Sequence, residues 1–230
     1  MPRFFVKKEQ VKKTTIEILG EDIKHIKNVL RKQIGEDIEI CDKDTKKSYI
    51  CEIEKIEEKS ILTKIIEELQ SNDNKIEVDI YQGLPKAEKM ELIIQKSVEL
   101  GANAIIPVEM KRCVVKIASK DEMKKITRWQ KIAESAAKQS GRDTIPEIKN
   151  IVNVEKIAQL INKYDSVLVA YENEKENTIK QELLKLKQYK KTEQKIKIGV
   201  VIGPEGGLEE KDVELLKQKD AEVAEFARFE

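Results

Sequence analysis

The fold is most readily inferred from Ile196–Leu208, which reads IKIGVVIGPEGGL. An apolar run, Ile198–Ile202, ends abruptly at Gly203–Gly207, and a helix-like pattern follows. Open α/β sheets bind ligands where a buried strand runs into such a turn, at the carboxyl ends of the strands. Glycines let the backbone turn sharply and approach a ligand closely. The stretch predicts either a ligand-binding turn or an ordinary connection between a strand and a helix, and the spacing alone does not decide between them.

The chemistry of this turn narrows the class of ligand. It lacks the Gly-Lys-Ser/Thr ending of a phosphate-binding loop and carries Glu205 instead. A carboxylate opposes a polyphosphate and tolerates a neutral or cationic ligand. The turn also comes late in the chain and has no Gly-x-Gly-x-x-Gly pattern. A nucleotide-binding enzyme of the ordinary doubly wound type is therefore disfavoured.

From Ile76 onward, strands and helices alternate on both sides of the turn. The pattern predicts strands at Ile76–Tyr81, Ala104–Val108, Ser166–Tyr171 and Ile196–Ile202, and helices at Lys86–Leu100, Lys120–Ser140, Asn177–Gln188 and Leu208–Lys219. The first of these helices is strongly amphipathic, is entered after Pro85 and stops at Gly101. Such alternation predicts an α/β fold with a mainly parallel sheet covered by helices.

Residues 1–70 have a different rhythm, typical of a small β-barrel. Short strands are expected at Phe4–Val6, Thr14–Leu19, Ile38–Cys41, Ser48–Ile53 and Ser60–Ile66. The polar break Ser71–Asn74 is the expected boundary, which divides the chain into domains 1–72 and 73–230.

One helix interrupts the expected barrel strands. Asp22 is its expected cap, and its apolar face is formed by Ile23, Ile26, Val29 and Leu30. His25 and Arg31 lie off that face. They are either surface residues of an exposed helix or contacts to a nucleic-acid backbone.

The amino-acid composition indicates the cellular compartment and argues against disulfide and metal sites. Three cysteines without a CxxC pair argue against a disulfide framework or a zinc site and fit a reducing compartment. A single histidine weakens any metal site further. No signal-peptide pattern and no apolar run near 18 residues is present, so we expect a cytoplasmic protein that is not embedded in a membrane.

Positive charge is concentrated although the chain as a whole carries only +1. Between Lys111 and Arg142 ten basic residues face three acidic ones, and the first thirteen residues are also basic. A basic segment beside a ligand turn indicates a polyanionic substrate held next to a small cofactor. The alternative is a solvated helix face in a lysine-rich protein. Arginine is suited to bidentate phosphate contacts, and three arginines fall in this segment.

Short motifs along most of the chain form a set whose order and spacing are specific. They are Met1–Val6, His25, Val29-Leu30-Arg31, Gly35-Glu36, Leu84-Pro85-Lys86, Gln95-Lys96, Glu99-Leu100-Gly101, Pro107, Arg112, Arg128-Trp129, Ala136, Gln139-Ser140-Gly141-Arg142, Ile145-Pro146 and Ile202–Gly207. With this set the chain resembles the bacterial small-subunit rRNA (uridine-N3) methyltransferases, a branch of the α/β-knot (SPOUT) methyltransferases.

The resemblance implies a PUA-like RNA-binding barrel followed by a SPOUT knot domain. It implies S-adenosylmethionine as the cofactor, a homodimer, and N3 of a uridine in 16S rRNA of the small ribosomal subunit as the methyl acceptor. No metal is implied. The expected cofactor-binding residues are Ala170, Tyr171, Glu172, Ile202, Gly203, Pro204, Glu205, Gly206 and Gly207.

The catalytic residues that we expect follow from the chemistry of the acceptor nitrogen. N3 of uridine carries a proton and must lose it before it attacks, so the site needs a base or groups that stabilise the uridine anion. Arg112 and Arg142 are the candidates for stabilising the anion, in competition with phosphate binding, and Glu205 ranks lower as a general base. The expected RNA contacts, which are mainly salt-sensitive contacts to phosphates, are Arg3, His25, Arg31, Lys116, Arg128, Lys131 and Lys138.

The carboxyl-terminal end departs from the family pattern. Family members continue with a segment of the type Leu-Gly-x-Arg-Ile-Leu-Arg-x-Glu-Thr-Ala, whereas this chain reads AEVAEFARFE from Ala221 and stops. Arg228 aligns with the first family arginine. Either the sequence is cut short in this segment, or the knot segment and the cofactor pocket of this chain are incomplete. The alternative function is a non-catalytic RNA-binding protein of the same fold.

Overall fold

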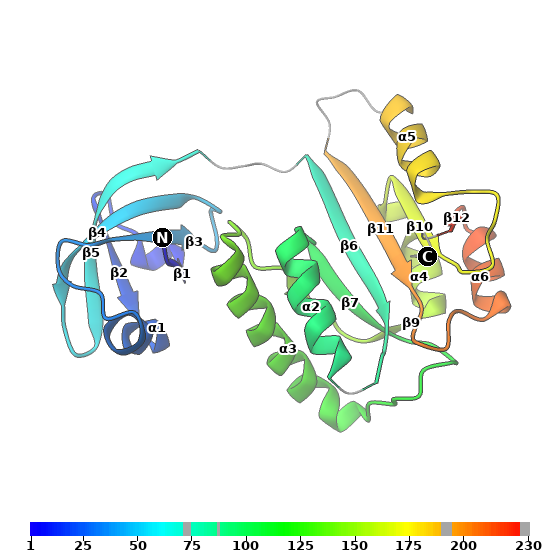
Figure 1. Ribbon diagram of the computed structural model, residues 1–230, viewed down its shortest axis with the longest axis horizontal. Helices are drawn as coiled ribbons and strands as arrows, with labels where there is room; N and C mark the ends of the chain where they lie inside the picture. Colours follow the sequence, from blue (N-terminus) through cyan, green and yellow to red (C-terminus); the bar gives the residue numbers. More distant parts are fainter. Residues whose placement is uncertain (71–74, 87, 190–194, 226–230) are drawn as a thin grey trace. The chain divides into compact units, whose positions relative to one another are not determined.

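The structure is a computed structural model that describes residues 1–70, 75–86, 88–189 and 195–225 (Figure 1). Backbone contacts divide the chain into two compact units. Unit 1 comprises residues 1–73 and 135–145, and unit 2 comprises residues 74–134 and 146–230. The expected boundary at Ser71–Asn74 and the expected family arginine, Arg228, lie outside the described residues.

Unit 1 is built on a five-stranded mixed sheet that forms the predicted PUA-like half-barrel. Its strands are β1 (Arg3–Val6), β2 (Thr15–Leu19), β3 (Asp37–Asp42), β4 (Ser48–Ile56) and β5 (Ser60–Leu69). Their order is β1-β3-β4-β5-β2, with β1 parallel to β3 and the other pairs antiparallel. Two register shifts between β4 and β5 bend the sheet around its core. That core is formed by alternating inward residues such as Ile16, Ile18, Ile38 and Ile40.

The helix of unit 1 differs from its prediction. α1 (Glu21–Lys24) starts directly after Gly20, so Asp22 lies inside the first turn and is not the cap. A π-helical turn, His25–Val29, follows, in which the Leu30 N–H bonds the His25 carbonyl. Because this turn is wider than an α-helical one, the apolar face is broken. Ile23 and Ile26 are buried as predicted, but the prediction is wrong for Val29 and Leu30, which are 69% and 37% exposed.

Unit 2 contains the predicted parallel sheet. Its strands are β6 (Ile76–Gly83), β7 (Ala104–Glu109), β8 (Glu147–Ile148), β9 (Val152–Asn153), β10 (Ser166–Ala170), β11 (Ile196–Ile202) and β12 (Glu222–Ala224). The order is β12-β10-β11-β6-β7-β8, with β9 also paired to β7, and every pair is parallel. The strands β8, β9 and β12 were not predicted, because two or three residues carry no periodicity.

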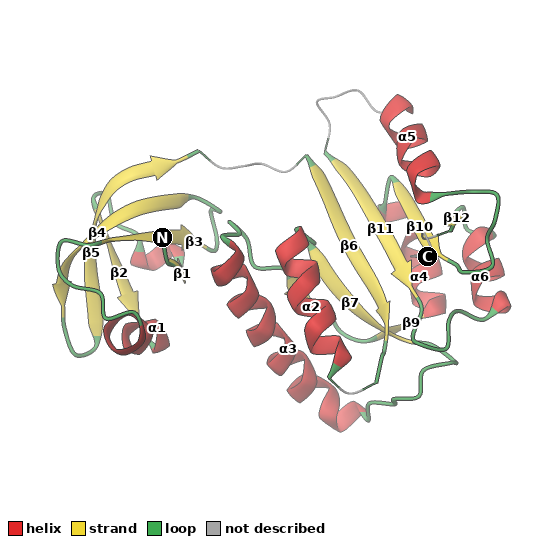
Figure 2. Ribbon diagram, in the orientation of Figure 1, coloured by secondary structure: helices red, strands yellow, loops and turns green. Residues whose placement is uncertain are grey.

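Helices cover this sheet (Figure 2). They are α2 (Lys89–Leu100), α3 (Ser119–Ser140), α4 (Val154–Leu160), α5 (Ile179–Tyr189) and α6 (Glu210–Lys217). α2 ends at Gly101 in the left-handed conformation, as its sequence predicts, and Arg128 of α3 pairs with Glu91 of α2 at 2.7 Å. α4 and α6 pack against each other, and α4 was not predicted. No helix among the described residues is long and apolar enough to cross a membrane.

Candidate functional site

The glycine-rich turn lies at the edge of the unit 2 sheet where the parallel strands have their carboxyl ends. β11 ends at Ile202, and the residues after it form a tight turn closed by a hydrogen bond from the Gly207 N–H to the Pro204 carbonyl at 2.9 Å. Gly207 has φ +72°, a conformation that favours glycine. The sheet topology therefore places an irregular backbone segment where open α/β sheets bind ligands.

Close packing requires glycine at two further positions. A Cβ atom at Gly83, the last residue of β6, would lie 2.6 Å from the backbone nitrogen of Pro204. A Cβ atom at Gly203 would lie 3.0 Å from the carbonyl carbon of Gly207. The end of β6 and the turn thus pack backbone against backbone. Gly83 was not predicted as part of the site, although a glycine at a strand end next to another glycine-rich strand end is a usable signal.

Glu205 holds the turn to the segment that leads into α2. Its two carboxylate oxygens accept the Lys86 N–H at 3.1 and 3.3 Å, and Lys89 Nζ lies 3.0 Å from Oε1. The hydrogen bond from Lys89 and the backbone hydrogen bonds lower the pKa of Glu205. A carboxylate with a lowered pKa is a weaker base, so the geometry favours a structural role for Glu205 over general base catalysis.

Arg112 also contacts the turn. Its Nη1 donates to the Gly206 carbonyl at 3.0 Å, and the Arg112 backbone and Cβ pack so closely on Gly206 that a Cβ there would lie 3.2 Å from Arg112 Cβ. The neighbouring Lys111 pairs with Glu209 at 3.1 Å, which ties the same loop to the segment before α6. An exposed arginine, two strand ends and the turn therefore meet at one edge of the sheet.

The end of β10 completes this edge. The Tyr171 N–H donates to the Ala224 carbonyl of β12 at 3.2 Å. The Glu172 carboxylate lies against Gly207, where a side chain would collide with it. The structure therefore brings together the two stretches predicted for cofactor binding, Ala170–Glu172 and Ile202–Gly207.

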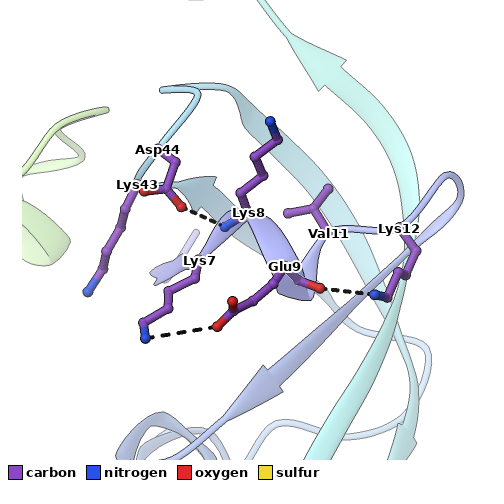
Figure 3. A pocket seen from close by; sticks show the side chains of 7 residues that line it. All are labelled: Lys7, Lys8, Glu9, Val11, Lys12, Lys43 and Asp44. Carbon is purple, nitrogen blue, oxygen red and sulfur yellow. Dashed lines mark hydrogen bonds and ion pairs between the residues drawn. The ribbon is translucent and has the colours of Figure 1, made fainter.

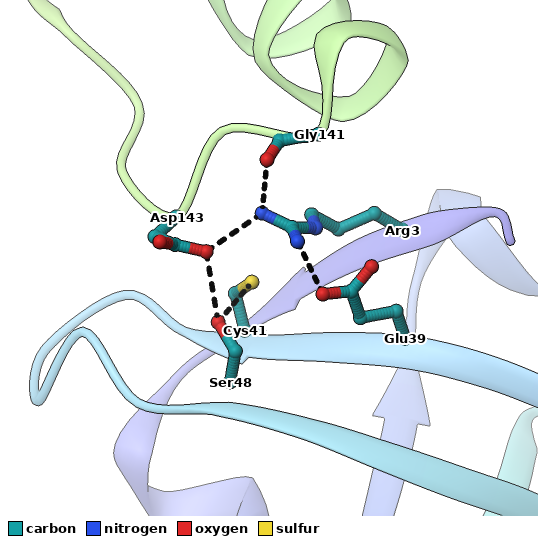
Figure 4. A network of polar contacts seen from close by, with 6 residues as sticks. All are labelled: Arg3, Glu39, Cys41, Ser48, Gly141 and Asp143. Carbon is teal, nitrogen blue, oxygen red and sulfur yellow. Dashed lines mark hydrogen bonds and ion pairs between the residues drawn. The ribbon is translucent and has the colours of Figure 1, made fainter. Parts of the chain in front are cut away.

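Arg142 lies in unit 1, on a loop that follows α3. Gly141 has φ +67°, and the Arg142 N–H donates to the Ala137 carbonyl at 3.1 Å, which ends the helix. Arg3 of β1 donates to the Gly141 carbonyl and to Asp143 Oδ1 (Figure 4). The Arg142 side chain is half-buried and makes no hydrogen bond or ion pair within the described parts of the chain.

Comparison with known proteins identifies the architecture. A family description, RNA methyltransferase domain, matches residues 72–228, and a second, RNA methyltransferase PUA domain, matches residues 18–66. The ribosomal RNA small subunit methyltransferase E of Bacillus subtilis is 37% identical over 227 residues, which cover 96% of this chain and 86% of the relative. The chain belongs to the ribosomal RNA small subunit methyltransferase E family.

Solved structures agree with this assignment. The structure of the same enzyme from Neisseria gonorrhoeae, bound to S-adenosyl methionine, has 25% identity and a TM-score of 0.81, and the match covers 99% of this chain and 90% of that one. A methyltransferase from Legionella pneumophila, also with bound cofactor, has 26% identity and a TM-score of 0.79, over 98% and 89% of the two chains. The predicted family and fold class are confirmed.

The basic residues that were predicted to bind RNA in this methyltransferase-family chain fall into two groups. Arg3 is only 10% exposed and is held by Glu39 and Asp143, while Lys138 pairs with Asp22 at 2.7 Å. These internal ion pairs account for Arg3 and Lys138 without RNA. The exposed members are His25, Arg31, Lys116, Arg128 and Lys131, of which Arg128 pairs with Glu91.

A basic hollow on unit 1 adds residues that motif reasoning did not select. It has a volume of about 780 Å³ and is lined by Lys7, Lys8, Glu9, Val11, Lys12, Lys43 and Asp44 (Figure 3). Asp44 accepts the Lys8 backbone N–H at 2.8 Å, and Lys7 pairs with Glu9 at 3.9 Å. The basic start of the sequence is the signal that could have indicated this surface.

Thiol and metal chemistry find no support in the described residues. Burial raises the pKa of all three cysteine thiols, that of Cys51 to about 11, so none is a ready nucleophile at neutral pH. No group of three or more potential ligands gathers in the part of the chain that the structure describes.

Proposed function

We propose that this protein transfers a methyl group from S-adenosylmethionine to N3 of a uridine in 16S rRNA of the small ribosomal subunit. The observation that carries this proposal is the backbone-lined turn at the carboxyl edge of the parallel sheet, in a chain of the methyltransferase E family. The N. gonorrhoeae and L. pneumophila relatives were solved with the same cofactor.

The residues at the turn suit this cofactor. Gly203, Gly206 and Gly207 carry no side chain of their own, so we assign the polar groups of the cofactor to peptide groups of this turn, beside the Arg112 and Glu172 side chains that pack on it. The Glu172 carboxylate, which lies against Gly207, suits a cationic sulfonium and hydroxyl groups better than a polyphosphate. When bound, S-adenosylmethionine supplies an electrophilic methyl group. The residues of the chain must then hold the acceptor base and favour the loss of its N3 proton.

We assign that task to arginines. A guanidinium beside O2 or O4 of uridine stabilises the anion formed when N3 loses its proton. Arg112 is a candidate because it stands at the turn, where it donates to the Gly206 carbonyl and keeps other N–H groups for a substrate. Arg142 is a candidate because its side chain has no acidic partner among the described residues. Glu205 is bound by the Lys86 N–H and by Lys89, so we assign it to the scaffold of the turn and not to proton abstraction.

RNA binding is assigned to exposed cations. Contacts from His25, Arg31, Lys116, Arg128 and Lys131, together with the lysines of the basic hollow, would hold phosphates without reading sequence. We further propose a homodimer, as the family resemblance implies, and a cytoplasmic location, where ribosomal subunits are the substrate. The domains proposed are a PUA-like domain at 1–72 and a methyltransferase domain at 73–230, which the two family matches support.

A methylation assay tests the function. Small subunits purified from cells that lack this protein are incubated with the full chain and methyl-labelled S-adenosylmethionine, and the labelled nucleoside is identified by mass spectrometry. We expect 3-methyluridine in 16S rRNA. A parallel reaction with protein-free 16S rRNA separates the free RNA from the assembled subunit as the substrate. Label on another atom, or no label from a chain that still binds the cofactor, would refute the proposed acceptor.

A further inference from the structure

Arg3 joins the first strand of unit 1 to the loop that follows α3. Its guanidinium donates to the Gly141 carbonyl, to Asp143 Oδ1 at 2.8 Å and to Glu39 Oε1 on β3 (Figure 4). Only 10% of the Arg3 side chain is exposed. A planar guanidinium with several fixed donors can satisfy three acceptors at once, which an ammonium group on a flexible stem does less well.

The sheet also holds Asp143 directly. Ser48 Oγ of β4 lies 3.2 Å from Asp143 Oδ1 and 3.0 Å from Cys41 Sγ of β3. The residues on both sides of Arg142 are thus fixed to the barrel, and the Arg142 N–H is fixed to the end of α3. The backbone that carries the Arg142 side chain has little freedom to move.

The same contacts decide the electrostatics around Arg142. Asp143 is the acid next to Arg142 in the sequence, and its carboxylate is already paired with Arg3. Glu39 is neutralised in the same way. Arg142 keeps its charge uncompensated by any described residue, and its half-buried Nε has no protein acceptor. An arginine in this state is prepared to bind an anionic or electron-rich ligand.

We propose that Arg3 is a positioning residue that holds the Gly141–Asp143 loop and occupies its carboxylate, so that Arg142 stays available to the target RNA. This inference rests on the proposed function of Arg142. Removal of Arg3 leaves Asp143 without its cationic partner, and Asp143 then competes with the RNA for Arg142. Misplacement of a catalytic group by about 1 Å can cost about a hundredfold in rate.

The test is a double-mutant cycle on methyl transfer to small subunits. Arg3→Met removes the charge and keeps the apolar stem, Arg142→Ala removes the positioned group, and the double variant combines them. We expect Arg3→Met to lower kcat by about ten- to a hundredfold, while the dissociation constants for S-adenosylmethionine and for rRNA change less than about threefold. The double variant should be no slower than Arg142→Ala alone, because both changes remove one function.

Two further variants separate positioning from loss of stability. Ile53→Val trims the fully buried core of unit 1 and should lower the melting temperature while kcat is retained. Arg3→Lys should restore the melting temperature more fully than it restores kcat, since one ammonium cannot hold Gly141, Asp143 and Glu39 together.

Several results would overturn the inference. Additive losses in the double variant would mean that Arg3 and Arg142 act independently. The kcat values of Arg3→Met and Ile53→Val are compared at an equal loss of melting temperature. If kcat falls equally in both variants, Arg3 has only a structural role. Normal turnover in Arg142→Ala would mean that Arg142 does not contribute to methyl transfer, so Arg3 could not act by positioning it. The nucleoside made by the unaltered chain is read separately, so a wrong acceptor atom would refute the proposed function and not be confused with these outcomes.

Discussion

Two candidate arginines stand in regions that are held in opposite ways. Arg112 belongs to the unit 2 turn, where glycines let backbone pack on backbone and the arginine itself bonds the Gly206 carbonyl. Arg142 belongs to a unit 1 loop held by charged and polar side chains, while its own guanidinium makes no bond to the described residues. Arg112 therefore helps to hold its site together, whereas the Arg142 side chain is left unbonded by the residues that hold its loop.

This difference predicts different responses to mutation. Where backbone packs on backbone, an added Cβ atom has no space and must push the neighbouring backbone segment away. A network of ion pairs can lose one member and still hold the loop in part. Substitutions at the turn should therefore cause a large loss of cofactor affinity. Substitutions at the loop should cause a partial loss of the rate of methyl transfer.

The largest effect on cofactor binding is expected from Gly83→Ala. The new methyl group would lie 2.6 Å from the Pro204 nitrogen and must push the turn out of place. Overpacking of this kind costs about 1 to 3 kcal/mol, so cofactor affinity should fall about 10- to 100-fold. The measurement is the rise in melting temperature on addition of S-adenosylmethionine. Gly35→Ala is the control, since Gly35 has φ +87° but open space around it, so it should cost stability and keep the cofactor-induced rise.

Exchange of the two arginines for alanine should separate their roles. Arg142→Ala should lower methyl transfer about 100-fold, comparable to the loss of one donor to a developing anion, with unchanged affinity for the cofactor and a smaller change in rRNA affinity. Arg112→Ala should weaken cofactor binding as well, because it frees the Gly206 carbonyl. Filter binding, calorimetry and single-turnover rates provide the three readouts. Equal losses of rRNA binding and transfer in Arg142→Ala would mean that it only holds phosphate.

Glu205 should give a smaller effect that depends on pH. Its pKa lies below the ordinary 4.5 because Lys89 and backbone N–H groups bind the carboxylate. A lowered pKa means that its stabilising contribution is present above the ordinary pKa and is lost as pH falls through the lowered value. The wild-type chain should therefore melt above Glu205→Gln at neutral pH, and the difference should vanish in acid. A difference that grows in acid would contradict this assignment.

The smallest effects are expected at exposed lysines. Lys116→Ala and Lys131→Ala should each reduce the slope of log affinity for rRNA against log salt by about 0.7 to 0.9 if each holds one phosphate. Lys138→Ala is the comparison, because Lys138 pairs with Asp22 and should change the slope less. Equal slopes for all three variants would mean that the ion pair does not withhold Lys138 from RNA.

Local pattern was enough to predict much of the molecule. The apolar run of β11 and the abrupt glycines after it predicted the turn, and the spacing of apolar residues together with Gly101 predicted α2. These features depend on a few neighbouring residues, so the sequence carries them directly. The set of spaced motifs predicted the family.

Long-range pairing is what local pattern could not predict. Arg3 was expected to bind RNA, yet its partners Glu39, Gly141 and Asp143 are 36, 138 and 140 residues away. The amphipathic pattern of α3 gives no sign that residues 135–145 group with unit 1. Val29 and Leu30 keep a helical spacing in sequence, but a π-helical turn exposes them.

The central claim is that the turn at Gly203–Gly207 binds S-adenosylmethionine. Its most direct test is a calorimetric titration of the full chain with that cofactor. We expect saturable binding that S-adenosylhomocysteine competes away. No saturable heat from a chain that still shows a cooperative melting transition would contradict it and would favour the non-catalytic RNA-binding alternative.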